Sequence, residues 1–79
     1  MIPAHEIEKL KEMILIRAGL TAIDDRACGE ISILIFKHNG NYISKVTLLR
    51  LYGLMAEGES TLSPVVATML WDFAHGKRY

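Results

Sequence analysis

The sequence predicts an all-α fold, with residues 1–79 forming a single small domain of four to five helices. Three observations support this prediction. Apolar residues recur at spacings of three and four in several segments, as on one face of a helix. Capping residues and glycines bracket those segments. Hydrophobic residues make up 51% of the chain, which is typical of a packed core and not of a disordered segment.

The first helix is predicted close to the N-terminus. Pro3 is tolerated in a first helical turn, and Gly19 can end the helix in a left-handed backbone conformation. Between them, apolar residues repeat at spacings of 3, 4 and 4. These residues are Ile7, Leu10, Ile14 and Ala18.

A second helix is predicted from Asp24 or Asp25, either of which can cap it, to the Asn39–Gly40 pair. Its expected inward face consists of Ala27, Ile31, Leu34, Ile35 and His38.

The same region has a β-hairpin alternative over residues 31–48. Residues 31–37 are rich in β-branched and aromatic side chains, and Asn39–Gly40 is a strong hairpin turn signal. The sequence offers no third strand, however, and an isolated hairpin is only marginally stable in water. We therefore favour the helix.

The third helix is short and bracketed by Ser44, a good N-cap, and Gly53, a good stop. Leu48, Leu51 and Met55 are expected to face the core. The residues expected to face outward are Lys45, Thr47 and Arg50.

A polar loop over residues 56–61 precedes a fourth helix, predicted over about residues 63–75. Ser63 caps it, Pro64 lies in its first turn, and Gly76 ends it. Its expected buried residues are Val66, Leu70, Phe73 and Ala74, and we expect Trp71 and Phe73 to belong to the core or to a dimer surface.

The charge pattern bears on the class of partner. The formal net charge is zero, which argues against a strongly basic nucleic-acid binder. Between Ile31 and Met55, however, the only formal charges are Lys37, Lys45 and Arg50. A basic middle between acidic flanks is compatible with one positive face on a neutral protein.

Catalysis has little support in the sequence. The three histidines lie in separate segments, and the chain has no HExxH pattern, no glycine-rich phosphate loop and no paired carboxylates at catalytic spacing. Cys28 is the only cysteine, and we interpret it as a small buried thiol. We expect neither an enzyme nor a metal, cofactor or small-molecule ligand.

No apolar run is long enough to span a bilayer, and the acidic residues before Met13–Ile16 are wrong for a secretory signal. These patterns indicate a cytoplasmic protein without a membrane partner.

The order of elements resembles the phage-repressor-like (lambda-repressor-like) helix-turn-helix domains of bacterial and phage regulators. The residues that carry the resemblance are Ser44-x-x-Thr47-Leu48-x-Arg50-Leu51-x-Gly53, followed by Ser63–Pro64 at the start of the next helix. The resemblance places the motif at about residues 25–54. It implies a transcriptional regulator that inserts residues 45–54 into the major groove of double-stranded DNA.

The resemblance also assigns roles to individual positions. Lys45, Val46 and Leu49 fall where base edges are read, while Thr47 and Arg50 fall where phosphates or bases are contacted. Lys37 and Tyr42 are candidates for contacts to the DNA backbone. The connection before Ser44 is longer than the tight turn of the repressors, and Leu49 stands where a polar residue is more usual.

Because one short helix makes few phosphate contacts, we expect a homodimer to be needed for tight binding. The alternative function is a helical protein–protein interaction module that uses Val46 and Leu49 without binding DNA.

Overall fold

The computed structural model describes residues 4–55 and 63–77, and this part of the chain is all-α. It contains four helices and no strand, so the predicted fold class is confirmed. The helices are α1 (Ala4–Ala18), α2 (Asp25–Asn39), α3 (Lys45–Leu51) and α4 (Pro64–Ala74). None of the helices in these two ranges has the length and apolar character that a bilayer crossing requires.

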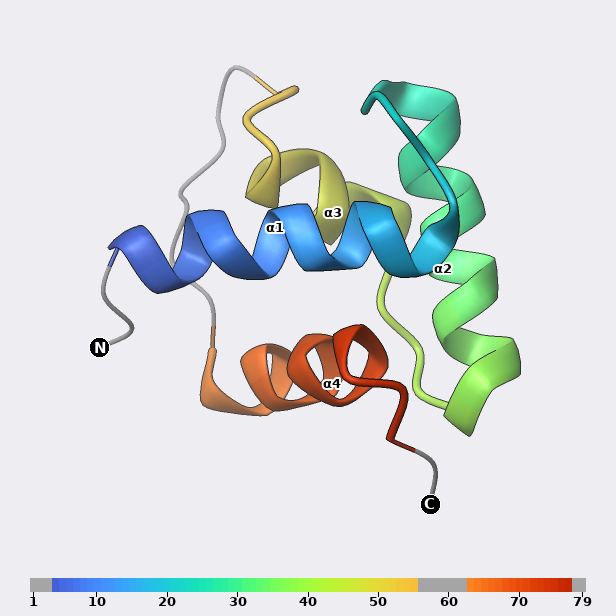
Figure 1. The fold of residues 1–79 in the computed structure, drawn as a ribbon. Helices are drawn as coiled ribbons and strands as arrows, with labels where there is room; N and C mark the ends of the chain where they lie inside the picture. Colours follow the sequence, from blue (N-terminus) through green and yellow to red (C-terminus); the bar gives the residue numbers. More distant parts are fainter. Residues whose placement is uncertain (1–3, 56–62, 78–79) are drawn as a thin grey trace.

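The helices form two packed pairs, α1 with α4 and α2 with α3. Figure 1 shows α1 running above α4 in that view, with α2 crossing at one end of both and α3 lying behind α1. Because α2 also contacts α1 and α4, it joins the two pairs around one core. The β-hairpin alternative over residues 31–48 is excluded and the favoured helix is confirmed, because residues 31–39 lie within α2 and residues 45–48 lie within α3.

Side-chain caps fix where three of the helices begin. Asp24 Oδ1 accepts a hydrogen bond from the backbone N–H of Ala27 at 2.7 Å, so Asp24 and not Asp25 is the cap of α2. Ser44 caps α3 and Ser63 caps α4 in the same way, each at 3.2 Å. Gly40 ends α2 with φ at 78°, a left-handed conformation that strongly favours glycine. Pro3 and residues 56–61 lie outside the described residues.

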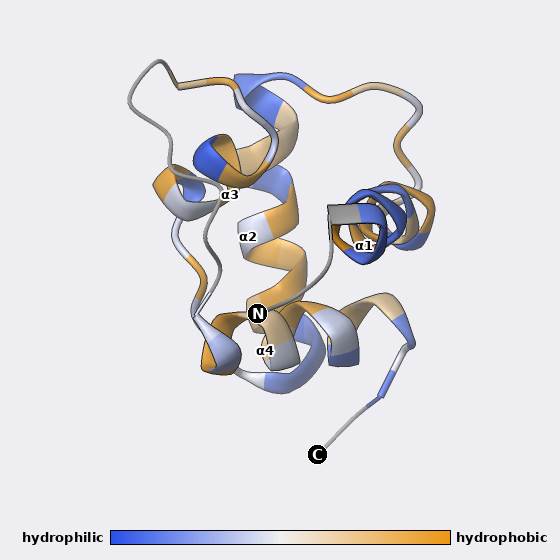
Figure 2. Ribbon diagram, turned by 90° about the vertical axis from the view of Figure 1, so that its left-hand side faces the viewer, coloured by the Kyte–Doolittle hydropathy of each residue, from blue (hydrophilic) through white to orange (hydrophobic). Residues whose placement is uncertain are grey.

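The core lies where all four helices meet. Its most completely buried side chains include Ile14 of α1, Ile31 and Ile35 of α2, Leu48 of α3 and Leu70 of α4. Figure 2 shows that apolar colour covers the half of α2 that ends at Asn39 on more than its core side. The helix therefore carries more apolar surface than this core buries.

Most of the predicted core residues are buried or half-buried, but two expectations were wrong. Leu34 is 37% exposed, because it lies at the edge of the inward face of α2. Met55 is half-buried beyond the end of α3 and does not belong to the core cluster. Of the two residues expected in the core or on a dimer surface, Phe73 is buried in the core. Trp71 is 41% exposed and lies against His75 with 4.5 Å between ring centroids.

Candidate nucleic-acid interface

The candidate interface is built on the joint between α2 and α3. Ser32 Oγ, in the middle of α2, donates a hydrogen bond of 2.6 Å to the backbone carbonyl of Ile43 in the connection. The side chain of Ile43 is buried in the core. These two contacts anchor the connection over residues 40–44 to α2, so the start of α3 has a fixed position although the turn is long.

The N-terminus of α3 is ordered by its own hydroxyl groups. Ser44 Oγ accepts from the backbone N–H of Thr47, and the two side-chain hydroxyls are 2.9 Å apart. Thr47 is half-buried and takes part in this cap. We therefore interpret the main role of Thr47 as stabilising the N-terminus of α3, not as contacting a ligand.

The outer face of α3 carries Lys45, Val46 and Arg50. Val46 is 44% exposed, and Arg50 is exposed. Within residues 4–55 and 63–77, no acidic side chain pairs with the guanidinium of Arg50. Leu49 was expected on this face, but it is half-buried and packs against the core cluster.

Lys45 is held against α2. Its ammonium forms an ion pair with Asp25, and its side chain remains 44% exposed. The stem of Lys45 passes over Gly29, where a Cβ would lie 3.7 Å from Cδ of the lysine. Asp25 therefore offsets the charge of Lys45 at the position where an anionic ligand would meet α3.

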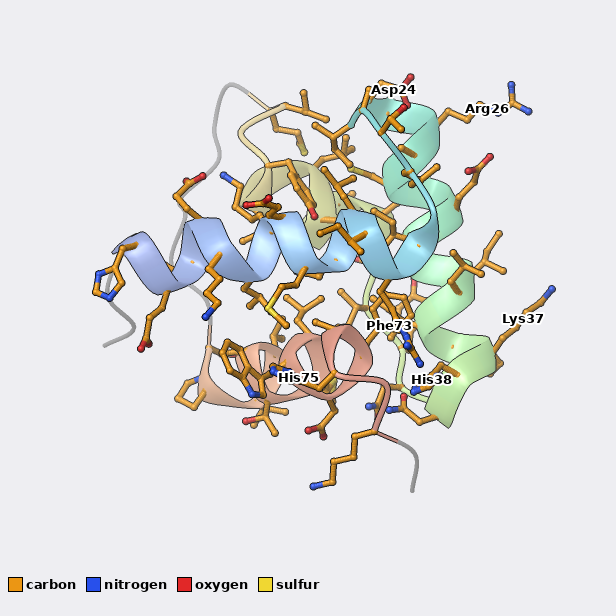
Figure 3. The ribbon with its side chains drawn as sticks, in the orientation of Figure 1. Asp24, Arg26, Lys37, His38, Phe73 and His75 are labelled. Carbon is orange, nitrogen blue, oxygen red and sulfur yellow. The ribbon has the colours of Figure 1, made fainter. Side chains whose placement is uncertain are left out.

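The remaining two predicted site residues lie outside α3. Tyr42 is 73% exposed in the connection just before α3, so it can reach a ligand bound there. Lys37 lines a shallow pocket with Arg17 of α1 and Phe73 of α4, and Figure 3 shows it pointing away from the body of the molecule. Lys37 therefore lies beside α1 and α4, twelve residues along α2 from Asp25, the ion-pair partner of Lys45.

Two polar side chains near α3 are withdrawn from solvent, the half-buried Tyr52 and the buried Cys28. The hydroxyl of Tyr52 donates a 2.7 Å hydrogen bond to the carbonyl of Lys11 in α1. Burial, with a smaller contribution from Cys28, raises the pKa of the Tyr52 phenol well above its usual range. Burial also raises the pKa of the Cys28 thiol, and the carboxylates of Asp25 and Asp24 add to that effect.

Sequence reasoning missed three residues that shape this region, namely Asp25, Ser32 and Tyr52. Asp25 was considered only as a cap, and nothing in the spacing indicated that it would pair with a lysine twenty positions further on. Ser32 and Tyr52 act through long-range hydrogen bonds to backbone carbonyls, for which the sequence carries no local signal. The α3 helix is also shorter than expected, since it ends at Leu51 and not at residue 54.

The geometry defines a small four-helix domain in which a short helix is held on the outside of a longer one. The chain matches no protein-family model, no curated protein and no solved structure.

Proposed function

We propose that this domain binds double-stranded DNA through the outer face of α3, as the DNA-binding part of a transcriptional regulator. The observation that supports the proposal is the division of α3 into two faces. Leu48 and Leu51 are buried, while Val46 and Arg50 face solvent next to Lys45. A helix held in this way on the outside of a domain is the arrangement that major-groove recognition requires.

The dimensions of an α-helix agree with this use. An α-helix with its side chains is about 10–12 Å in diameter, and the B-DNA major groove is about 12 Å wide, so the groove admits such a helix. In the proposed complex, Arg50 contacts a phosphate or a guanine edge. Val46 meets an apolar group such as a thymine methyl, and Lys45 and Tyr42 contact the phosphate backbone.

The charge balance predicts weak, salt-sensitive binding. The net charge is zero, and Asp25 already pairs with Lys45. About three to six phosphate contacts give a correspondingly steep loss of affinity as salt rises. A single copy of the domain is therefore expected to bind DNA weakly.

A fluorescence-anisotropy titration against mixed duplex DNA at about 50 and 200 mM salt tests the proposal. Arg50→Ala is expected to weaken binding about tenfold at low salt, because it removes one charged contact. Lys9→Ala is the matched control, since it removes one positive charge from an exposed position on α1. Equal losses in the two variants, or no binding at low salt, would contradict the proposal.

A second candidate function is a helical protein-interaction module. The observation that favours it is the apolar character of exposed residues near α3, namely Tyr42 at 73%, Val46 at 44% and Leu54 at 44% exposed. The ion pair between Lys45 and Asp25 further reduces the positive charge of this face. If Asp25→Asn also fails to bind DNA at low salt, the interaction module becomes the better account.

A further inference from the structure

The face of α2 that points away from the core carries a strip of apolar surface. Ile33 is 56% exposed and Phe36 is 57% exposed, although both lie on a helix whose other side is buried. Gly29 lies four residues before Ile33, so the three residues share one stripe. We call Gly29, Ile33 and Phe36 the outer strip. It contains two large side chains and, at the glycine, the aliphatic stem of Lys45, which covers the helix there.

Charged residues line one flank of the outer strip. Arg26, Glu30 and Lys37 follow one another at spacings of four and seven, so they lie along the same side of α2. Figure 3 shows Arg26 and Lys37 pointing away from the molecule on the same side of α2. Arg26 Nε lies 3.6 Å from Glu30 Oε1, in an exposed ion pair. Acidic and basic groups therefore lie at different heights along this flank.

These positions are self-complementary about Ile33. Glu30 lies three residues before it and Lys37 four residues after it, which is about 4.5 and 6 Å along the helix axis. A twofold axis at Ile33 that relates two antiparallel α2 helices brings the charged flank of one copy next to the charged flank of the other. Lys37 of each copy then faces Glu30 of the other copy. The same register places Phe36 of one copy beside Gly29 of the other, where the stem of Lys45 covers the helix. A parallel pair would instead bring like groups to the same height.

We infer that a second copy of this chain docks on the outer strip, with the two α2 helices antiparallel and crossing near Ile33. The interface joins apolar contact at Ile33 with contact of Phe36 on the aliphatic stem of Lys45 in the other copy. Two symmetry-related pairs of Lys37 with Glu30 flank these contacts. The inference goes beyond DNA binding and does not depend on it, because Val46 and Arg50 take no part in it.

One helix pair buries less than the roughly 1,600 Å² of a standard interface, so a dissociation constant on the order of 0.1 mM is expected. Sedimentation equilibrium of the full chain from about 0.01 to 1 mM measures it. Glu30→Lys and Lys37→Glu are each expected to weaken self-association about tenfold, because the twofold axis makes each reversal act twice.

The mixture of these two variants gives the sharpest result. In a heterodimer, Lys37 of one chain faces the native Glu30 of the other, and the introduced lysine and glutamate also face each other. The equimolar mixture is therefore expected to regain association close to that of the wild type. A mixture that stays as weak as its components would overturn the proposed register.

Two further variants test the apolar contact. Ile33→Ser is expected to weaken association about tenfold, whereas Ile16→Ser, at a 70% exposed isoleucine on α1, leaves it unchanged. Circular dichroism confirms that each variant is folded. A wild type that stays monomeric at about 1 mM, or a dimer equally weakened by Ile16→Ser, would overturn the inference.

Discussion

The side chain of Lys45, the first residue of α3, forms an ion pair with Asp25, the first residue of α2. The pair ties the two helices together and offsets the positive charge at the proposed DNA interface. Asp25→Asn is therefore expected to increase DNA affinity about two- to fivefold at low salt, the range that an exposed ion pair of this kind supports. Anisotropy titration of the wild type and the variant measures the change.

Glu8→Gln is the matched control for that experiment. It removes one negative charge from an exposed residue of α1 that pairs with Lys11, far along the chain from α3. An equal gain in both variants would mean that net charge alone sets the affinity. In that case Asp25 would have no special role at the interface.

The hydrogen bond from Ser32 to Ile43 fixes the connection between α2 and α3. Ser32→Ala is expected to lower the free energy of unfolding by about 1 kcal/mol, because the carbonyl of Ile43 loses its donor. Urea denaturation measures this loss. Thr68→Ala is the control, since the exposed Thr68 hydroxyl bonds only within its own helix and its removal should have little effect. A loss at Ser32 no larger than at Thr68 would show that the bond contributes nothing.

Tyr52 links α3 to α1 through its hydroxyl, and Tyr52→Phe is expected to cost about 1 kcal/mol at pH 8. Because burial raises the folded-state pKa of Tyr52, its neutral form contributes stability in full below the unfolded pKa of about 10. That contribution is lost as pH rises from there through the folded pKa. Urea denaturation at pH 8 and at higher pH should show the wild-type advantage over Tyr52→Phe shrinking. If the difference in unfolding free energy between the wild type and Tyr52→Phe does not change with pH, the raised pKa of the Tyr52 phenol is contradicted.

Cys28 is fully buried in α2, and its thiol pKa is raised by burial and by nearby carboxylates. Both effects suppress the thiolate, which is the reactive form. The native protein is therefore expected to react with Ellman's reagent far more slowly than the urea-unfolded chain. Absorbance at about 412 nm follows the reaction, and comparable rates in the two states would show that the packing around Cys28 opens easily.

The four helices could be predicted from the sequence because their signals are local. Ser44 and Ser63 cap the helices that they were expected to cap, and α2 ends at the predicted Asn39–Gly40 pair. The competing hairpin had an equally strong turn signal at Asn39–Gly40. Burial of Ile31 and Ile35 on one face decides for the helix, and that outcome depends on α1 and α4 covering that face.

The arrangement of the candidate site could be predicted only in part. The outward position of Arg50 and the burial of Leu48 follow from helical periodicity alone. Leu49 is half-buried because of how α3 is rotated against α2. Lys37 lies beside Arg17 and Phe73 because α1 and α4 flank that end of α2. The pairing of Lys45 with Asp25 depends on the same packing, and helical periodicity within one segment carries no information about it.

We propose that the outer face of α3 contacts DNA. Amide chemical-shift mapping of the ¹⁵N-labelled chain, titrated with a short mixed duplex at low salt, is the first measurement to make. We expect the largest shifts to fall on Tyr42 and on residues 44–50, and to diminish when salt is added. Shifts that cluster instead on α4 or the exposed side of α1, or no shifts at low salt, would contradict it.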